Sequence, residues 1–261
     1  MRTHHFAFCP LLFAACVGQT GGNAITFTAA AAGPAEAISG QPLSWSANGF
    51  DITVTEAKLH VGAVYLDEAA PVSGAQATGC YLTGTYVAQE TAALDVDLLN
   101  PAPQPFSQPA VGITEPAPLV GQVWLTGGDV NQVADATAIL EIAGTANRAG
   151  TAFPFTGTVT IGANRAPASG GTGGGNSICK QRIVTPIAVS LTVAPTGGLL
   201  LRINPRLFFT GVDFSQLPSD SAGGYRFSDD PTAPGYAPTG QALYSNLHST
   251  APYAFGWTNA L

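Results

Sequence analysis

The chain has 261 residues, of which 46% are hydrophobic and 10% are charged, and its formal net charge is -7. This length allows one large β-sandwich or two small domains. The 31 glycines and 20 prolines favour short strands and many turns over long helices. A duplex DNA or RNA partner is excluded, because recognition of the phosphate backbone needs clustered Lys and Arg, and the arginines of this acidic chain are scattered singly.

The N-terminal residues indicate export. Residues 1–5 form a short basic start, residues 6–13 form an apolar run, and Ala14 and Ala15 precede Cys16. This arrangement resembles the lipobox of bacterial lipoproteins, in which the signal peptidase cuts before the cysteine that carries the lipid. We therefore predict a signal peptide over 1–15, lipidation of Cys16 and a flexible tether over 16–23. The alternative is an ordinary secretory signal that is cleaved a few residues later.

Residues 24–65 show the alternation of apolar and polar residues that is typical of β-strands. Apolar side chains recur at every second position: Ile25 and Phe27, then Phe50, Ile52 and Val54, then Leu59, Val61, Ala63 and Tyr65. The parity changes between Val54 and Leu59. This change predicts either a β-bulge around Glu56 to Lys58 or two strands that meet at a bend.

Residues 138–161 predict a β-hairpin, with two strand-like arms around a turn at 149–152. Further along the chain we expect strands at 182–193 and 198–203, an aromatic segment at 205–214 that packs on the sandwich edge, a helical turn near 240–247, and a closing strand containing Tyr253, Phe255 and Trp257. These elements together predict an all-β fold, an antiparallel β-sandwich with long Gly/Pro-rich loops.

Two cysteines, Cys80 and Cys179, are left once Cys9 is removed with the signal peptide and Cys16 is acylated. An even pair in an oxidising compartment predicts a disulfide. A two-thiol metal site is the alternative. If the two cysteines pair, the glycine-rich run at 170–175 is an internal loop rather than a linker, and residues 24–261 form a single domain.

No catalytic residue is predicted, because the sequence has no Gly-x-Ser-x-Gly elbow, no His-Glu-x-x-His pair and no Walker loop. After processing, His60 and His248 are the histidines that a secreted hydrolase would have to use. Three carboxylate groupings could hold Ca²⁺, although none completes an EF-hand: Asp95 with Asp97, Asp129 with Asn131, and Asp229 with Asp230. Asp and Asn in turns more often bind their own backbone, so no cofactor is predicted.

Four segments carry a family resemblance: Ile25-Thr-Phe27, Gly40-Gln-Pro-Leu43, residues 48–66, and Leu94-Asp-Val-Asp-Leu-Leu99. Their layout resembles that of the methanobactin-associated copper-binding periplasmic proteins over about a third of the chain. The resemblance implies an exported β-sandwich that binds metal. It makes copper the possible cofactor, with His60 and the neighbouring Glu56 as the candidate metal ligands.

We expect the protein to be non-catalytic and to bind another envelope protein or a small ligand. It would be attached to the outer membrane by its lipid alone, in the periplasm or at the cell surface. A periplasmic copper-binding protein and a secreted hydrolase are the two alternatives.

The disulfide gives the first testable prediction. Non-reducing peptide mapping of protein taken from the periplasm should yield one crosslinked peptide that contains both Cys80 and Cys179. The Cys80→Ser variant should lose roughly 2 to 5 kcal/mol of unfolding free energy, because the unfolded chain is then no longer constrained. Free thiols at both positions would disprove the pairing and reopen a domain boundary near residue 170.

Overall fold

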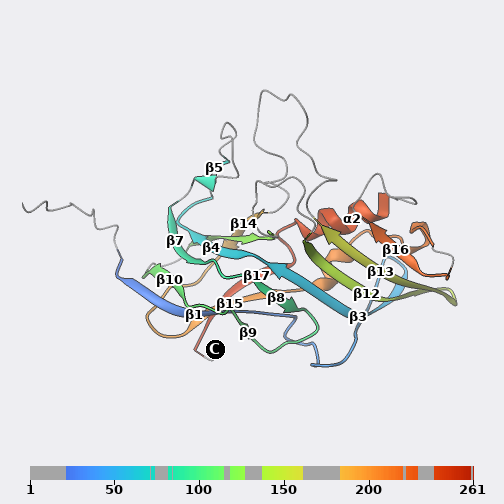
Figure 1. The fold of residues 1–261 in the computed structure, drawn as a ribbon, viewed down its shortest axis with the longest axis horizontal. Coiled ribbons are helices and arrows are strands. Elements are labelled where there is room, and N and C mark those ends of the chain that lie inside the picture. The colour runs from blue at the N-terminus through green and yellow to red at the C-terminus, as the bar shows by residue number, and fades with distance from the viewer. Residues whose placement is uncertain are drawn as a thin grey trace, which may run out of the picture.

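The computed structural model describes residues 22–70, 72–73, 82–83, 85–114, 118–126, 137–160, 183–219, 222–228, 238–259 and 261. Cys16, Cys80, Cys179, the predicted signal peptide and the glycine-rich run lie outside these ranges. The described chain is all-β, as predicted, and its two large sheets pack together in a sandwich-like arrangement (Figure 1). In this part of the chain, no helix is long and apolar enough to cross a membrane.

We call the nine-stranded sheet the first sheet. Its strand order is β14-β11-β4-β7-β10-β1-β15-β17, and β9 also pairs with β1. The bounds are β1 (Ala24–Ala32), β4 (Ala63–Asp67), β7 (Tyr86–Glu90), β9 (Gln104–Pro105), β10 (Ala110–Ile113), β11 (Leu119–Trp124), β14 (Ile183–Val189), β15 (Gly198–Ile203) and β17 (Tyr253–Thr258). Strands β14 and β17 at its two ends approach each other, so this sheet is strongly curled.

The six-stranded second sheet has the order β16-β13-β12-β3-β2, and β8 also pairs with β3. The bounds are β2 (Leu43–Ala47), β3 (Phe50–Val61), β8 (Leu94–Asp97), β12 (Ala138–Arg148), β13 (Thr151–Thr160) and β16 (Tyr225–Ser228). Strands β5 (Val72–Ser73) and β6 (Leu82–Thr83) form a separate small ladder.

Most strand pairs are antiparallel, as predicted for the sandwich, but each sheet also contains one parallel pair that the sequence analysis did not predict. Strand β1 runs parallel to β15, and β13 runs parallel to β16. In each parallel pair the two strands are far apart in sequence. The long connection between them lets the second strand enter the sheet in the same direction as the first. Alternation of apolar residues has the same period in both arrangements, which is why the sequence pattern did not distinguish them.

One continuous stretch of chain passes from the second sheet into the first at Gly62. Strand β3 ends at Val61 and β4 begins at Ala63. The Gly62 amide donates to the Trp124 carbonyl oxygen, with an N···O distance of 2.8 Å. A Cβ at position 62 would collide with the side chain of Thr126, so the bend requires glycine.

The parity change that the sequence shows after Val54 is a β-bulge. Val54 pairs with Gly144 and Glu56 pairs with Ala143, which leaves Thr55 without a Cα partner on β12. The bulge therefore lies one residue before the predicted 56–58 segment, inside a single strand. It turns Glu56, Lys58 and His60 outward, while the alternate residues of β3 remain buried.

The predicted hairpin at 138–161 is confirmed as β12 and β13. Its turn consists of two residues, Ala149 and Gly150, with φ values of 50° and 82°. Positive φ at both positions is the geometry of a type I′ turn, which suits the twist of the flanking strands. The β2–β3 hairpin turns in the same way at Asn48 and Gly49.

The aromatic segment near residue 210 lies in the interior and not on the sandwich edge as predicted. It forms two 3-10 helices, η2 (Pro205–Phe209) and η3 (Phe214–Gln216), which cover the inner face of the second sheet. Phe214 packs against the rings of Phe50 and Phe155 with centroid distances of 5.2 and 5.0 Å, and Phe209 packs against Phe155 at 5.5 Å. All of these rings are buried. The strand predicted at 198–203 and the closing strand β17 are confirmed. The strand predicted at 182–193 ends at Val189, and the helical turn predicted near 240–247 is a ten-residue helix, α2 (Pro238–Leu247).

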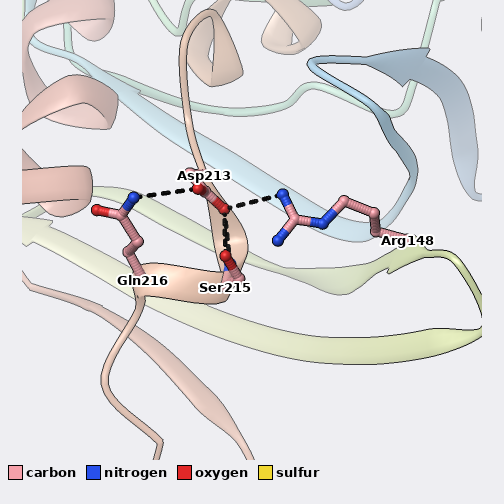
Figure 2. Close-up of polar contacts among 4 residues, drawn as sticks. All are labelled: Arg148, Asp213, Ser215 and Gln216. Carbon is pink, nitrogen blue, oxygen red and sulfur yellow. Dashed lines mark hydrogen bonds and ion pairs between the residues drawn. The ribbon is translucent and has the colours of Figure 1, made fainter.

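Asp213 joins this aromatic layer to the tip of the β12–β13 hairpin (Figure 2). Its carboxylate caps η3 by accepting from the Ser215 amide at 3.0 Å and the Ser215 hydroxyl at 2.6 Å. The guanidinium of Arg148 lies 3.5 Å away and also covers the ring of Phe50, at 4.3 Å from its centroid. The Ser215 bonds and the Arg148 charge lower the pKa of Asp213 below 3.8.

This cap gives a stability prediction. The Asp213→Ala variant should lose about 1 kcal/mol of unfolding free energy in urea titrations, a typical cost for removing an N-cap. Because the pKa is lower in the folded state, the carboxylate stabilises the fold above its unfolded pKa, and this contribution disappears as the pH falls through the folded pKa. The difference between variant and parent should therefore shrink in strong acid.

As a control, Asp51→Ala removes an exposed acid that accepts a hydroxyl bond from Ser46, with no helix to cap. Its loss should be clearly smaller. An Asp213→Ala loss that persists unchanged at low pH would contradict the proposed role of the ionised carboxylate.

Candidate functional site

The outer face of the second sheet carries rows of polar side chains that cross the strands. Register places Arg226, Thr156, Ala143 and Glu56 in one row over β16, β13, β12 and β3. The next row contains Thr158, Glu141, Lys58 and Asp97. The inward-facing residues between these positions belong to the hydrophobic core, so the alternation fixes the polar rows on the surface.

Two neighbouring grooves run over this face. The larger has a volume of about 540 Å³, and its polar lining includes Glu56, Glu141, Thr156, Thr158 and Arg226. The smaller has a volume of about 380 Å³ and is lined by residues 40–42, 55–58, Asp97 and Leu99. Glu56 belongs to both linings, and we call the pair of hollows the sheet groove.

A surface ion pair crosses the groove floor between β3 and β12. The Lys58 Nζ lies 3.7 Å from Glu141 Oε2, and both side chains are about half exposed. Exposed pairs of this kind contribute little to stability. The pair therefore leaves both side chains available to exchange this contact for one with a polar ligand.

His60 lies two residues beyond Lys58 on β3 and pairs with Asp95 on β8. Its Nδ1 is 2.7 Å from Asp95 Oδ1, and the His60 side chain is 18% exposed, against 66% for Asp95. Because an ionised carboxylate only accepts, Nδ1 carries the hydrogen of this bond, and in the neutral imidazole the lone pair is then on Nε2. Metal-binding histidines are commonly held in this way.

The predicted pair of metal ligands does not form a coordination shell. Glu56 is four residues from His60 on the same strand, which corresponds to about 13 Å along the strand axis. Among the described residues, no three His, Cys, Asp or Glu side chains gather where they could hold a metal ion. The carboxylate beside His60 is Asp95, and Glu56 lies too far along the strand to bind the same ion. One imidazole and one carboxylate do not make a copper site by themselves, so copper binding stays a prediction.

The other sequence candidates are placed as follows. The Asp97 carboxylate accepts a hydrogen bond from the Leu99 amide at 2.9 Å. This is the bond to nearby backbone that is common for Asp in turns. His248 follows α2, and its Nδ1 lies 2.8 Å from the Tyr244 carbonyl oxygen. Asp129, Asn131, Asp229 and Asp230 lie outside the described residues.

Sequence reasoning missed most of the groove. Thr156, Thr158 and Glu141 are ordinary outward positions of the predicted hairpin, and Arg226 comes from β16, which the sequence analysis did not predict. Their shared location depends on strand register. The available signal was the alternation of threonine with apolar residues in β13, which marks a solvent-facing row.

Comparisons of this chain with protein-family models, with curated proteins and with solved structures find no match. The function must therefore be argued from the site itself.

Proposed function

We propose that this protein is an exported, lipid-anchored and non-catalytic binding protein of the bacterial cell envelope. The observation that carries the proposal is the sheet groove, two adjacent hollows on the polar outer face of the second sheet that share Glu56. The export and the anchor rest on the sequence before Cys16. The acidic net charge of the chain disfavours a polyanionic ligand.

The lining defines the chemistry of the ligand. Carboxylates accept hydrogen bonds, the Thr156 and Thr158 hydroxyls both donate and accept, and the Arg226 guanidinium donates. A groove of this composition suits a polar ligand rich in hydroxyl, amide or amine groups. The buried phenylalanine layer beneath β12 and β13 holds its floor rigid, which lowers the cost of binding.

One observation favours the hydrolase as a second candidate. Glu56 and Glu141 are diagonal neighbours on β3 and β12, a relation that puts the two residues about 7 to 8 Å apart. Glycoside hydrolysis with inversion uses two carboxyl groups about 6.5 to 9.5 Å apart, a separation that the side chains of two residues at these positions can reach. Against it, Lys58 already pairs with Glu141, and the groove is open to water. We therefore rank binding first.

The anchor gives a prediction of its own. Globomycin blocks cleavage of lipoprotein signals, so it should cause the unprocessed precursor to accumulate in a Gram-negative host. Immunoblotting of membrane fractions would measure this. Ordinary processing of the parent in the presence of globomycin, or release of Cys16→Ser protein in the same form as the parent, would contradict lipidation.

The groove gives a second prediction. Thr158→Trp should fill the larger hollow without disturbing the core, because position 158 is exposed and faces outward. Detergent-solubilised protein would be sedimented with a detergent-washed cell envelope. We expect Thr158→Trp to reduce the bound fraction severalfold. The control is Thr151→Trp, an exposed position on the same strand that does not line either hollow.

Equal binding by Thr158→Trp and the parent would disprove the groove as the binding surface. The same preparations should show no turnover of chromogenic glycosides. Turnover that is lost in both Glu56→Gln and Glu141→Gln would replace the binding function with the hydrolase.

A further inference from the structure

A second polar cluster lies on the first sheet, away from the groove. Asp67 on β4 and Gln122 on β11 are both fully buried, with 0% of each residue exposed. Tyr65 lies two residues before Asp67 on the same face, and Tyr86 on β7 is the cross-strand partner of Asp67. This buried acid has no part in the groove.

Hydrogen bonds fix the orientation of the cluster. The Trp124 indole donates from Nε1 to Gln122 Oε1 at 2.9 Å, and Gln122 Nε2 donates to Asp67 Oδ2. Since an indole can only donate, the Gln122 amide must turn its oxygen toward Trp124 and its NH₂ group toward Asp67. The second carboxylate oxygen, Oδ1, is buried and meets no donor in the described chain.

A buried carboxylate with an unsatisfied oxygen is costly. Burial raises the pKa of Asp67, and the bond from Gln122 opposes this effect in part. The described titratable side chains beside it are Tyr65 on β4 and Tyr86 on β7, while Gln122 on β11 does not titrate. Burial raises the pKa of Tyr65, and the negative charge of Asp67 raises it further.

Aromatic rings border the acid. Tyr65 packs between Tyr86 and Trp124, with both centroid distances equal to 5.0 Å. Tyr86 is 37% exposed, so the aromatic row leads from the surface toward Asp67. Aromatic faces attract cations, most strongly where water is excluded.

This combination selects one class of cation. Ca²⁺ and Mg²⁺ require six or more oxygen ligands, whereas no third acidic side chain gathers here among the described residues, and the Gln122 amide oxygen is engaged by Trp124. A large, weakly hydrated cation needs one counter-charge and aromatic contact. Organic ammonium ions have this chemistry.

We propose that Asp67, Tyr65 and Tyr86 form a binding site for a small organic ammonium ion, whose charge pairs with Asp67 Oδ1 and whose alkyl groups lie against the two tyrosine rings. The site does not depend on the sheet groove, so the two can fail separately. Tyr86 is 37% exposed, so its ring forms the solvent-side wall of the proposed site. Gln122 and Trp124 are positioning residues that hold the carboxylate.

The probe is tetramethylammonium chloride, added to the purified full chain in detergent, with tert-butanol as an uncharged analogue. We expect saturable binding of the cation and none of the alcohol. The Trp124 indole NH signal should shift, because Trp124 is connected to Asp67 through Gln122. Binding should weaken in acid, where a proton occupies Asp67.

Asp67→Asn keeps the shape and the Gln122 bond and should remain folded, yet bind the cation at least about tenfold more weakly. Asp51→Asn is the control with the same change in net charge on the other sheet. Tyr86→Ala should also weaken binding, and Tyr86→Phe should retain it, because the ring supplies the contact. Absence of saturable binding, equal binding by Asp67→Asn, or equal binding of tert-butanol would overturn the proposal.

Discussion

The bend at Gly62 determines where both candidate sites lie. At this residue the chain leaves the second sheet and enters the first. The Gly62 amide donates to the Trp124 carbonyl oxygen, and the absence of a side chain at Gly62 leaves room for Thr126. His60 precedes the bend by two residues, and Tyr65 follows it by three. Strands β7 and β8 follow the same path beside it, since β7 pairs with β4 and β8 with β3. The polar face of one sheet and the buried acid of the other are therefore carried by the same pair of crossing strands.

The two sheets achieve their packing by different means. Under the second sheet, phenylalanines from η2, η3 and the strands form one aromatic layer, and each fully buried ring contributes about 2 to 3 kcal/mol. In the first sheet, the second half of β1 consists of alanines that are almost entirely buried, which brings neighbouring elements close to its backbone. The aromatic layer packs under the sheet whose outer face bears the groove. The thin alanine strand suits the strongly curled sheet.

The sequence predicted what depends on local periodicity and missed what depends on register. Alternation was sufficient for the all-β class, for the 138–161 hairpin and for the closing strand at Tyr253, because each pattern repeats within a few residues. It carried no information on direction, so the parallel partners of β1 and β13 were missed. The parity change near Glu56 predicted a bulge as one of two alternatives, and the structure has that bulge at Thr55. The true neighbours of Glu56 and His60, Ala143 and Asp95, are set by pairings with distant strands that no local pattern reveals.

Two buried acids of the first sheet differ in a way that bears on function. Glu90 is 2% exposed, and its Oε1 accepts from the Ala92 amide at 2.7 Å, where the chain leaves β7 for β8. That bond satisfies backbone in the crossing segment, although Glu90 Oε2, like Asp67 Oδ1, is buried and meets no donor among the described residues. Asp67 satisfies no backbone group among the described residues, and its hydrogen-bond partner is the Gln122 side chain, itself held by Trp124. The two acids therefore differ in what they hold: Glu90 holds backbone, and Asp67 is held by side chains, which is the feature that the proposed ammonium site would explain.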